Sequence, residues 1–575
     1  MCRVPVALFG FAAGLLGLTA HAATGTWAGD AAGNWSDTTK WTSGTLADGA
    51  TFTANLTFNI TAARTVTLDS ARTIGTVNIG DLTTTSSSFT LALGANNLTF
   101  SNGGSAAVLA QNSTSNGDTI SGASGGKLVI AGNGTLNVTN AASGKTLTIS
   151  SGIISGLSSG TQTLNFNNAN TVTVSGVIGD GATGGKIAVT QTGFGTTTLS
   201  TNNTFTGSIT QSAGTLTLSG TNTAASVNLS GGTLNINNAG ALGAGTLTIS
   251  GGTINNSSAA AIINTGNNAQ AWNGNFTFSG TRALDLGTGA VALGAANITT
   301  TVNGNSGTAL TVGGNITGTG KSLTKAGTGT LILSGTNTYD GGTTINGGVL
   351  QFTHAGALAG SGQNLAVNYG GTAAFGYIID QSFLTDRIVS GSEGTIGLGV
   401  SPSGDLDFSV AGLTKLSLGA TGAGAVTYSG ALWTPTDGIY RLGGGGGTLI
   451  FNPTLSGSNS LLVGGGGSGG SVTLVNAGTY SGATIVTGSV GSGNAAVGTA
   501  GGAGLLQTNV LAGASTTPFG TNTALTLNNG ALGLGTAGAL ASGNIMNVTG
   551  YDVTYNGQNA INLAVGGGTS VTFAA

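Results

Sequence analysis

Short runs of alternating apolar and polar residues recur along most of the chain. Leu, Ile or Val alternates with Thr, Asn or Ser, as in Thr215–Leu218, Thr246–Ile249 and Thr330–Leu333, and pairs of Gly separate such runs. A period of two bounded by Gly and Asn predicts short β-strands with one buried face, and β-branched Thr suits the outward positions. Apolar residues at helical spacing stand out only at residues 379–388, where one short amphipathic helix is expected.

Some of these runs return at a fixed spacing. Residues 226–238 (SVNLSGGTLNINN) align with residues 246–258 (TLTISGGTINNSS), 20 residues further on, with Ser-Gly-Gly-Thr in register. A period of this length is typical of a solenoid, in which each coil stacks on the one before it. The sequence therefore predicts an all-β, right-handed parallel β-helix. Aliphatic residues would face inward, Thr, Ser and Asn outward, and Gly would supply positive φ at the corners.

Composition narrows the class of protein. Of 575 residues 109 are Gly, 39% are hydrophobic, only 5% are charged, and the formal net charge is −3. Disorder usually accompanies low hydrophobicity and high net charge, so the chain is expected to be ordered. The weak net charge gives no electrostatic attraction to nucleic acid, which is excluded as a partner. The polar surface should consist of hydroxyls and amides.

The first 22 residues have the three parts of a secretory signal peptide. Arg3 precedes an apolar run from Val4 to Leu18, and Ala20-His21-Ala22 forms a small-x-small cleavage site. The run is too short for a spanning helix, so no membrane span is expected in the mature chain. Cleavage near Ala22 predicts a secreted or cell-surface protein.

Cleavage at that point would also limit the chemistry of the mature chain. It would remove Cys2 and His21 and leave His354 as the only histidine. Thiolate and His-rich metal sites and a cysteine nucleophile are then excluded. No cofactor and no metal site are expected.

A longer unit, GTGTLILSGTNTYDGGTTINGGVLQF, occupies residues 327–352. Residues 193–218 align beneath it without a gap, and residues 472–486 form a decayed copy. The positions that define the unit are Gly327, Gly329, Leu331, Leu333, Tyr339, Gly341, Gly342 and Gly348. The aromatic residue is expected to cover the interior of a coil at a corner, and the Gly after it lets the backbone turn.

This unit closely resembles the autotransporter-associated β-strand repeat, also called the passenger-associated transport repeat, of large bacterial surface proteins. The resemblance implies an exported parallel β-helical passenger whose repeats assist secretion or folding. It also implies the export machinery as a partner.

The sequence divides into five predicted segments. Residues 1–22 are the signal peptide, 23–82 a Trp-rich N-terminal cap, 83–372 a β-helix with the repeats, 373–450 a charged and aromatic inserted module, and 451–575 further coils. A membrane barrel has long alternating strands with aromatic girdles. Residues 550–575 contain only three aromatic residues, so no barrel is expected there.

Two clusters could bind a ligand. Trp27, Trp35 and Trp41 lie within 15 residues and could stack against sugars, although atypical terminal repeats of solenoids favour a cap. Residues 380–441 hold nine charged residues, and on a strand Asp405 and Asp407 would share one face near Trp433. Such carboxylates could bind Ca²⁺ or act as acid and base, but a solvated strand face is favoured.

Three functions remain open. The favoured hypothesis is a non-catalytic passenger with a structural or adhesive role, which would contact surface glycans or other cells. The alternatives are a polysaccharide lyase or hydrolase on a β-helix, and a glycan-binding surface protein without catalysis. The enzyme hypothesis requires the charged residues of 380–441 to converge beside Trp433 or Tyr440.

Overall fold

The computed structural model describes residues 22–487, except 84–86, 133, 295–296, 305–307, 465–468 and 477, together with the later strand segments 504–508, 524–528, 531–534, 545–547, 552–555 and 570–572. The chain separates into two units, Met1–Lys186 and Ile187–Ala575. The predicted signal peptide lies outside the described residues except for Ala22. The five segments drawn from the sequence stay predictions.

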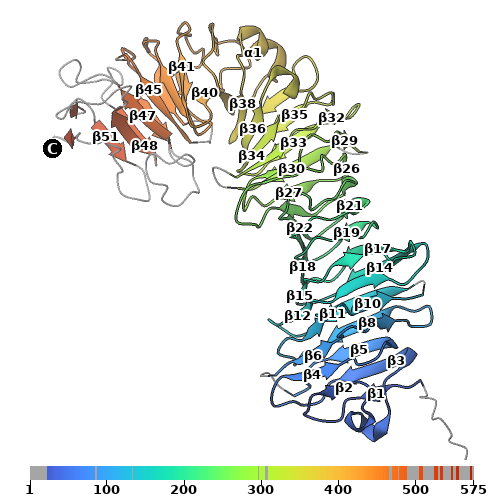
Figure 1. Ribbon diagram of the computed structural model, residues 1–575. Coiled ribbons are helices and arrows are strands. Elements are labelled where there is room, and N and C mark those ends of the chain that lie inside the picture. The colour runs from blue at the N-terminus through green and yellow to red at the C-terminus, as the bar shows by residue number, and fades with distance from the viewer. Residues whose placement is uncertain are drawn as a thin grey trace, which may run out of the picture. The chain divides into compact units, whose positions relative to one another are not determined.

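Two parallel sheets form unit 1 (Figure 1). The first contains β1 (Gly25–Thr26), β3 (Gly49–Leu56), β5 (Arg72–Ile79), β7 (Leu98–Phe100), β8 (Ala107–Gln111), β10 (Lys127–Ile130), β11 (Thr135–Asn140), β13 (Gly152–Ser155), β14 (Thr161–Phe166) and β16 (Ile178–Gly179). The second contains β2 (Gly33–Asn34), β4 (Arg64–Thr67), β6 (Phe89–Ala92), β9 (Thr119–Ser121), β12 (Thr146–Ile149) and β15 (Thr171–Val174).

The strands of unit 2 fall into several groups of parallel neighbours. One contains β17 (Lys186–Gln191), β19 (Ile209–Gln211), β21 (Ser226–Leu229), β23 (Thr246–Ile249), β26 (Gln270–Trp272), β29 (Val291–Leu293) and β32 (Ile316–Thr317). A second contains β18 (Thr196–Leu199), β20 (Thr215–Leu218), β22 (Thr233–Ile236), β24 (Thr253–Asn255), β27 (Phe276–Phe278), β30 (Ile298–Val302), β33 (Leu323–Ala326), β35 (Thr343–Ile345) and β37 (Leu365–Val367).

The remaining strands lie mostly later in unit 2. The third group contains β25 (Ile262–Ile263), β28 (Leu284–Asp285), β31 (Ala309–Val312), β34 (Thr330–Leu333), β36 (Gly348–Phe352), β38 (Gly371–Phe375), β39 (Thr395–Leu398), β40 (Ser417–Ala420), β42 (Ile439–Leu442), β44 (Ser460–Val463), β46 (Thr484–Thr487), β48 (Ala524–Asn528) and β51 (Asp552–Tyr555). The fourth contains β41 (Ala425–Tyr428), β43 (Thr448–Phe451), β45 (Gly470–Leu474), β47 (Gly504–Thr508) and β49 (Ala531–Leu534), and β50 (Ile545–Asn547) pairs with β52 (Ser570–Thr572).

Helix is scarce among the described residues. It comprises α1 (Gln381–Arg387) and the short 3-10 turns η1 (Thr38–Lys40), η2 (Thr42–Gly44) and η3 (Ala355–Ala357). The Asp380 carboxylate caps α1 by accepting a hydrogen bond from the Phe383 amide at 2.9 Å, and Leu384 is buried beneath the helix. The amphipathic helix expected from the sequence at this place is therefore present.

Alternation along the strands builds the core. In β12 the residues alternate between half-buried Thr and buried Leu147 or Ile149. The next strand in the sheet, β15, is in register, so Val172 stacks on Leu147 and Val174 on Ile149. Repeated from coil to coil, this pairing makes continuous apolar columns. The predicted all-β parallel solenoid is confirmed, with about 18 turns.

The outward positions form polar columns. In unit 2 one column consists of threonines paired in register on six successive strands: Thr196, Thr215, Thr233, Thr253, Thr277 and Thr301. Beside it the Asn235 amide donates to the Thr217 hydroxyl at 2.9 Å, and the Asn255 amide donates to the Asn235 side-chain oxygen at 3.2 Å. The threonine column contributes a polar surface that needs few charges, as the composition suggested, whereas the asparagine ladder beside it is buried.

Coil length varies more than the sequence repeats suggested. The Asn235 to Thr217 bond joins residues 18 apart, whereas in unit 1 the Asn165 amide reaches Asn137, 28 residues back. Extra residues lie in the corners between strands, where the register of the strands does not depend on them. The strand pairing therefore continues through coils of different size.

The predicted inserted module contains solenoid strands. Across residues 371–420, β38, β39 and β40 pair in parallel register, with Phe375 opposite Leu398 and Ile396 opposite Leu418. Long connections between these strands carry α1 and the loop that follows it. Many of the charged residues of this region lie in those connections.

Candidate functional site

The best repeat turns a corner at Tyr339, between β34 and β35. The Tyr339 ring is fully buried, and its hydroxyl lies 2.7 Å from the Thr343 hydroxyl. Burial raises the pKa of Tyr339 to about 12, so the phenol is neutral at physiological pH. As expected from the sequence, the aromatic ring fills the inside of the coil, and the hydroxyl pair satisfies its polar end.

Close backbone contact explains the Gly that follows the aromatic residue. The Gly341 amide donates to the Lys321 carbonyl of the preceding coil at 2.8 Å. A Cβ at this position would lie 2.5 Å from the Lys321 carbonyl carbon, which is too close for any other residue. Gly342, Gly327 and Gly348 have φ of +91°, +77° and +62°, a region that favours Gly.

The remaining signature positions also contribute to the coil. Leu331 and Leu333 are fully buried, and the Gly329 amide donates to the Val302 carbonyl of the coil before it at 2.8 Å. The signature thus describes one complete corner and the strand that leads into it.

The copy at residues 193–218 has the same corner geometry, but the side chains inside it are apolar. Phe205 is fully buried, and Ile209 stands where Thr343 stands in the best repeat. The Gly207 amide donates to the Ile187 carbonyl at 3.0 Å, and a Cβ there would lie 2.1 Å from that oxygen. Tyr is therefore paired with Thr and Phe with Ile, so the polar end of the ring is either satisfied or absent.

The decayed copy at residues 472–486 shares this geometry. Tyr480 is fully buried, its hydroxyl lies 2.6 Å from the Thr484 hydroxyl, and the Gly482 amide donates to the Asn459 carbonyl at 3.0 Å.

Replacing Tyr339 or Tyr480 by Phe should lower the free energy of unfolding by about 0.5–1.5 kcal/mol, because a buried hydroxyl pair is lost. Phe205→Tyr should cost about 1–3 kcal/mol, because Ile209 offers the new hydroxyl no partner. Denaturant unfolding of the full chain measures each change. Equal stability of Phe205→Tyr and wild type would contradict this account of the corner.

Two polar positions of the repeats were missed in the sequence. Asn203 and Asn337 each precede the aromatic residue by two positions and are buried. Gln191 and Lys325 occupy equivalent positions just before the repeat and are also buried. The signal for the asparagine was present, because both good copies read Asn-Thr-aromatic. A Gln aligned with a Lys gave no such signal.

The Lys325 ammonium lies in a cradle of backbone carbonyls. It donates to the carbonyls of Ala326 at 2.7 Å, Gly327 at 2.8 Å and, from the next coil, Gly347 at 3.0 Å. In the first copy the Gln191 amide donates to the Gly193 carbonyl at 2.8 Å, so both side chains provide a donor at this corner. Burial lowers the pKa of Lys325 to about 7.

The three tryptophans of the N-terminal region pack on one another. Trp41 meets Trp27 and Trp35 edge to face, with ring centroids 5.3 Å and 5.1 Å apart. Their exposed fractions are 2%, 0% and 0%. The indole of Trp35 donates to the Ala47 carbonyl, and that of Trp41 to the Trp35 carbonyl, each at 2.8 Å. No ring face is open for a sugar, and the packing agrees with a cap.

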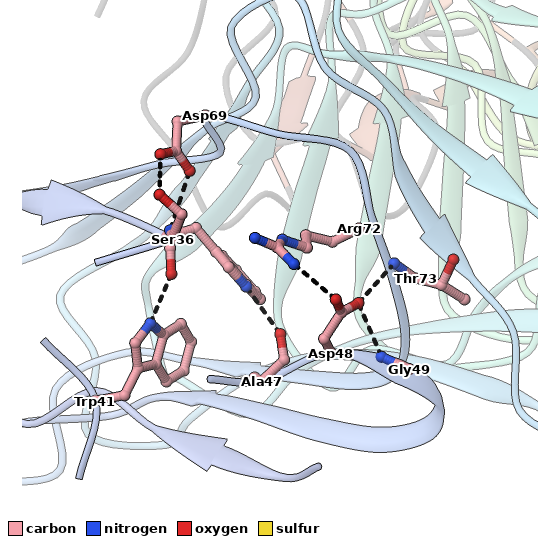
Figure 2. Close-up of polar contacts among 9 residues, drawn as sticks. Ser36, Trp41, Ala47, Asp48, Gly49, Asp69, Arg72 and Thr73 are labelled. Atoms are coloured by element: carbon pink, nitrogen blue, oxygen red, sulfur yellow. Dashed lines mark hydrogen bonds and ion pairs between the residues drawn. The ribbon is translucent and has the colours of Figure 1, made fainter. Parts of the chain in front are cut away.

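Charged and polar residues attach this region to the first coils (Figure 2). The Asp48 carboxylate accepts from Arg72 at 2.7 Å and from the Gly49 amide at 2.9 Å, and Asp69 accepts from the Ser36 amide at 3.0 Å. Arg64 lies 2.6 Å from Asp30, and its hydrogen bond is the main reason that the pKa of Asp30 falls to about 2. Apart from the contact between the neighbours Asp48 and Gly49, these contacts connect residues 24 to 34 positions apart.

The charged residues of 380–441 make contacts within different local structures. Arg387 donates to the Ala359 carbonyl at 2.9 Å, and Arg441 pairs with Asp437 at 2.7 Å. Asp380 caps α1, and the cap hydrogen bonds lower its pKa. Each side chain therefore has a structural partner, and the contacts do not form the shared acid-base arrangement that the enzyme hypothesis requires.

Asp405 and Asp407 lie in an irregular connection, whereas the sequence suggested one face of a strand. Asp405 accepts from the Ala431 amide at 2.6 Å, and Asp407 accepts from the Ser409 amide at 2.8 Å. Trp433 is 6% exposed and packs against the rings of Phe408, Tyr428, Tyr440 and Phe451. Both carboxylates hold turns, and the Trp belongs to the core.

The described ranges contain no group of three or more His, Cys, Asp or Glu side chains arranged to hold a metal ion. Over the same part of the chain, no helix is long and apolar enough to cross a membrane.

Comparison with known proteins identifies the family of the repeats. The family described as Passenger-associated-transport-repeat matches residues 189–211, 210–236 and 323–352. The chain is an autotransporter passenger-like repeat protein. Two of the three matched segments contain the Phe205 and Tyr339 corners predicted from the sequence; the segment 210–236 was not recognised there as a transport repeat. The copy at 472–486 is not matched.

A curated relative of this passenger-like chain is the protein named Adhesin BmaC autotransporter of Brucella suis biovar 1 (strain 1330). It is 31% identical over 303 residues, covering 47% of this chain and 8% of the relative. The chain thus spans only a small part of the length of the relative it matches. No solved structure matches the chain. The family implies a secreted or surface location.

Proposed function

We propose that this chain is a non-catalytic, adhesive segment of an exported passenger. The observation that carries the proposal is the presence of the transport repeats as coils of a parallel solenoid. The relative named an adhesin autotransporter supports the adhesive role. The enzyme alternative has no support, because the carboxylates that could serve as acid and base hold turns and helix ends.

The finer parts of the proposal concern export and partners. The signal peptide directs export and is cleaved near Ala22, and the export machinery is the first partner. Outside the cell the chain contacts surface glycans or other cells. The uncharged polar columns support this role, because they present hydroxyl and amide groups along many coils without repelling a negatively charged cell surface.

Beads coated with the purified full chain test adhesion. We expect them to bind epithelial cells in greater number than albumin-coated beads, and soluble chain should compete. Equal binding by both kinds of bead, or no competition, would overturn the adhesive role. Incubation of the chain with a panel of polysaccharides should release no new chain ends. Release that depends on Asp405 or Asp407 would instead support the enzyme alternative.

A further inference from the structure

The most exposed tyrosine of the described residues lies in a tight turn between β37 and β38. Tyr369 is 64% exposed. The Gly371 amide donates to the Asn368 carbonyl at 2.9 Å, and Gly370 has a φ of +86°, so the four residues form a turn with Tyr369 in the second position. The left-handed φ falls on Gly370, where it costs little. The turn therefore presents the Tyr369 ring to solvent without backbone strain.

The neighbouring coils are shorter at this turn. Tyr369 and Gly370 stand where the preceding coil has only Gly347, and in the following coil Glu393 leads directly into Gly394. A Cβ on Gly394 would lie 2.6 Å from the Asn368 carbonyl oxygen, so the following coil has no room for a side chain at that place. Glycine on both sides leaves the ring without a covering side chain from the same position of either coil.

Polar side chains of four successive coils line up beside this turn. We call them the outer ladder: Asn346, Asn368, Glu393 and Lys415. The backbone amides of the first three donate to carbonyls of the coil before them at 2.8, 2.9 and 2.9 Å, which places them at equivalent positions. The Asn368 side-chain amide donates to the Asn346 side-chain oxygen at 2.7 Å, and the Lys415 ammonium lies 2.6 Å from the Glu393 carboxylate. Both asparagines are exposed, and the side chains of Lys415 and Glu393 are 62% and 44% exposed.

The outer ladder has hydrogen-bonding capacity left for a ligand. Within the described part of the chain, the Asn346 side-chain nitrogen and the Asn368 side-chain oxygen have no hydrogen-bond partner, so the ladder offers both a donor and an acceptor. Glu393 and Lys415 neutralise each other. The rungs follow one another at the strand spacing of about 4.8 Å. An extended ligand lying along the solenoid can therefore bond to several rungs in turn.

We propose that the Tyr369 turn and the outer ladder form a binding site for a neutral polysaccharide chain. Sugar rings carry hydroxyl groups at the edge and an apolar C–H face that packs against an aromatic ring, and the site offers a partner for each. The ion pair leaves no net charge to select an acidic ligand. The inference rests on the proposed adhesive function and gives it a site and a class of ligand.

An apolar protein surface fits this site less well. The other exposed apolar residues of these coils, Ile378 and Val400, follow β38 and β39 and lie at the opposite end of the strands from Tyr369. The Tyr369 ring is therefore a single aromatic group among amides and charges and not part of a continuous apolar patch.

An array of immobilised neutral and acidic oligosaccharides, probed with the purified full chain, tests the class of ligand. We expect binding to at least one neutral oligosaccharide, with little change between low and high salt, because no net charge contributes. Binding to acidic oligosaccharides alone, a steep loss of binding in high salt, or binding to no sugar on the array would overturn the proposal.

Tyr369→Ala should weaken binding to the neutral oligosaccharide by about tenfold or more, because the stacking face is lost. Tyr369→Trp should retain binding, because it keeps an aromatic face. Phe194→Ala is the matched control, since Phe194 is an 89% exposed ring on a different coil, away from the outer ladder, and it should leave binding unchanged. Full binding by Tyr369→Ala, or an equal loss in Phe194→Ala, would contradict the assignment of the site.

Two ladder variants test the polar half of the site. Asn368→Ala should weaken binding of the neutral oligosaccharide by about threefold to tenfold, because one rung is lost. Glu393→Gln should leave Lys415 with an unpaired charge and so add binding to acidic oligosaccharides, while neutral binding stays within about twofold. If neither variant changes binding to either class, the ladder does not belong to the site.

The bead assay with the same variants separates this inference from the adhesive function. Beads coated with Tyr369→Ala should bind fewer epithelial cells than wild-type beads. Normal adhesion of these beads would overturn the inference and leave the proposed function standing. Binding of the wild-type chain to the array without adhesion of its beads would overturn the adhesive function and not the site. Adhesion that depends on Tyr369 without any binding to the array would favour a protein ligand and overturn the polysaccharide.

Discussion

Raising the pH from 7 to 9.5 should stabilise the protein, and Lys325 should be the main cause. The pKa of Lys325 is about 7 in the folded chain, whereas an unfolded lysine has its usual pKa of 10.5. Between these values the unfolded chain binds a proton that the folded chain lacks, so the free energy of unfolding increases with pH. The slope approaches about 1.4 kcal/mol per pH unit for a single group.

Lys325→Gln should remove this slope and keep the corner. The glutamine amide can donate to the Gly327 carbonyl, as Gln191 does to Gly193 in the first copy. Denaturant unfolding at several pH values measures the difference, and Lys127→Gln, which changes an exposed lysine, serves as control. Parallel pH profiles for wild type and Lys325→Gln would show that Lys325 keeps its proton when folded.

The pH range of this measurement should end near pH 9.5. Burial raises the pKa of Tyr339 and Tyr377 to about 12, so at higher pH the deprotonation of unfolded tyrosines would lower the free energy of unfolding.

Trp41→Ala should destabilise the first coils of unit 1 by about 3–5 kcal/mol, the usual cost of deleting a large buried ring. Trp41 packs against Trp27 and Trp35 and donates to the Trp35 carbonyl, so the variant loses ring contacts and a buried hydrogen bond together. Limited proteolysis should show earlier cleavage between residues 23 and 82, and near-UV circular dichroism should lose intensity.

The effect should be local. A coil of a solenoid contacts mainly its neighbours, so the resistance of unit 2 to proteolysis should not change. Phe194→Ala removes a ring that is 89% exposed and should leave proteolysis unchanged. Wild-type resistance of residues 23–82 in Trp41→Ala would mean that the three rings do not hold this region together.

Most of the fold could be predicted from the sequence because two simple signals agree. Alternating residues such as those of Thr146–Ile149 can bury only one face, and Ser-Gly-Gly-Thr at a fixed spacing places that face against its own repeat. The short helix at Gln381–Arg387 followed from its apolar spacing and the Asp before it. These features depend on local residues, so the sequence carries them directly.

Features set by contacts between coils could not be predicted. The residues next to Lys325 in the chain do not indicate that its side chain is buried, because one of its three acceptors, Gly347, lies 22 residues away. The Thr343 partner of Tyr339 is only four residues away, but its role is clear only once the ring is inside the coil. Asp405 and Asp407 were expected on a strand because they are two residues apart, but the connection between β39 and β40 is irregular there.

The run of glycines at 443–447 also has a role that the sequence alone does not reveal. The sequence suggests a turn or a joint, and the structure gives four successive glycines, Gly443–Gly446, positive φ as the chain passes from β42 to β43. A Cβ on Gly444 would lie 2.3 Å from the Thr395 hydroxyl of β39. Residues with side chains could not lie this close to the sheet, but the sequence does not reveal that the sheet is there.

Coils of unequal length have a practical consequence for protein engineering. Because neighbouring strands stay in register whether 18 or 28 residues separate them, a corner can accept extra residues at little cost to the strands on either side. A foreign peptide grafted into the exposed turn at Gly160, where φ is already +82°, would be carried on a rigid scaffold. Chains of this type are therefore suitable frames for presenting epitopes, one graft to each coil.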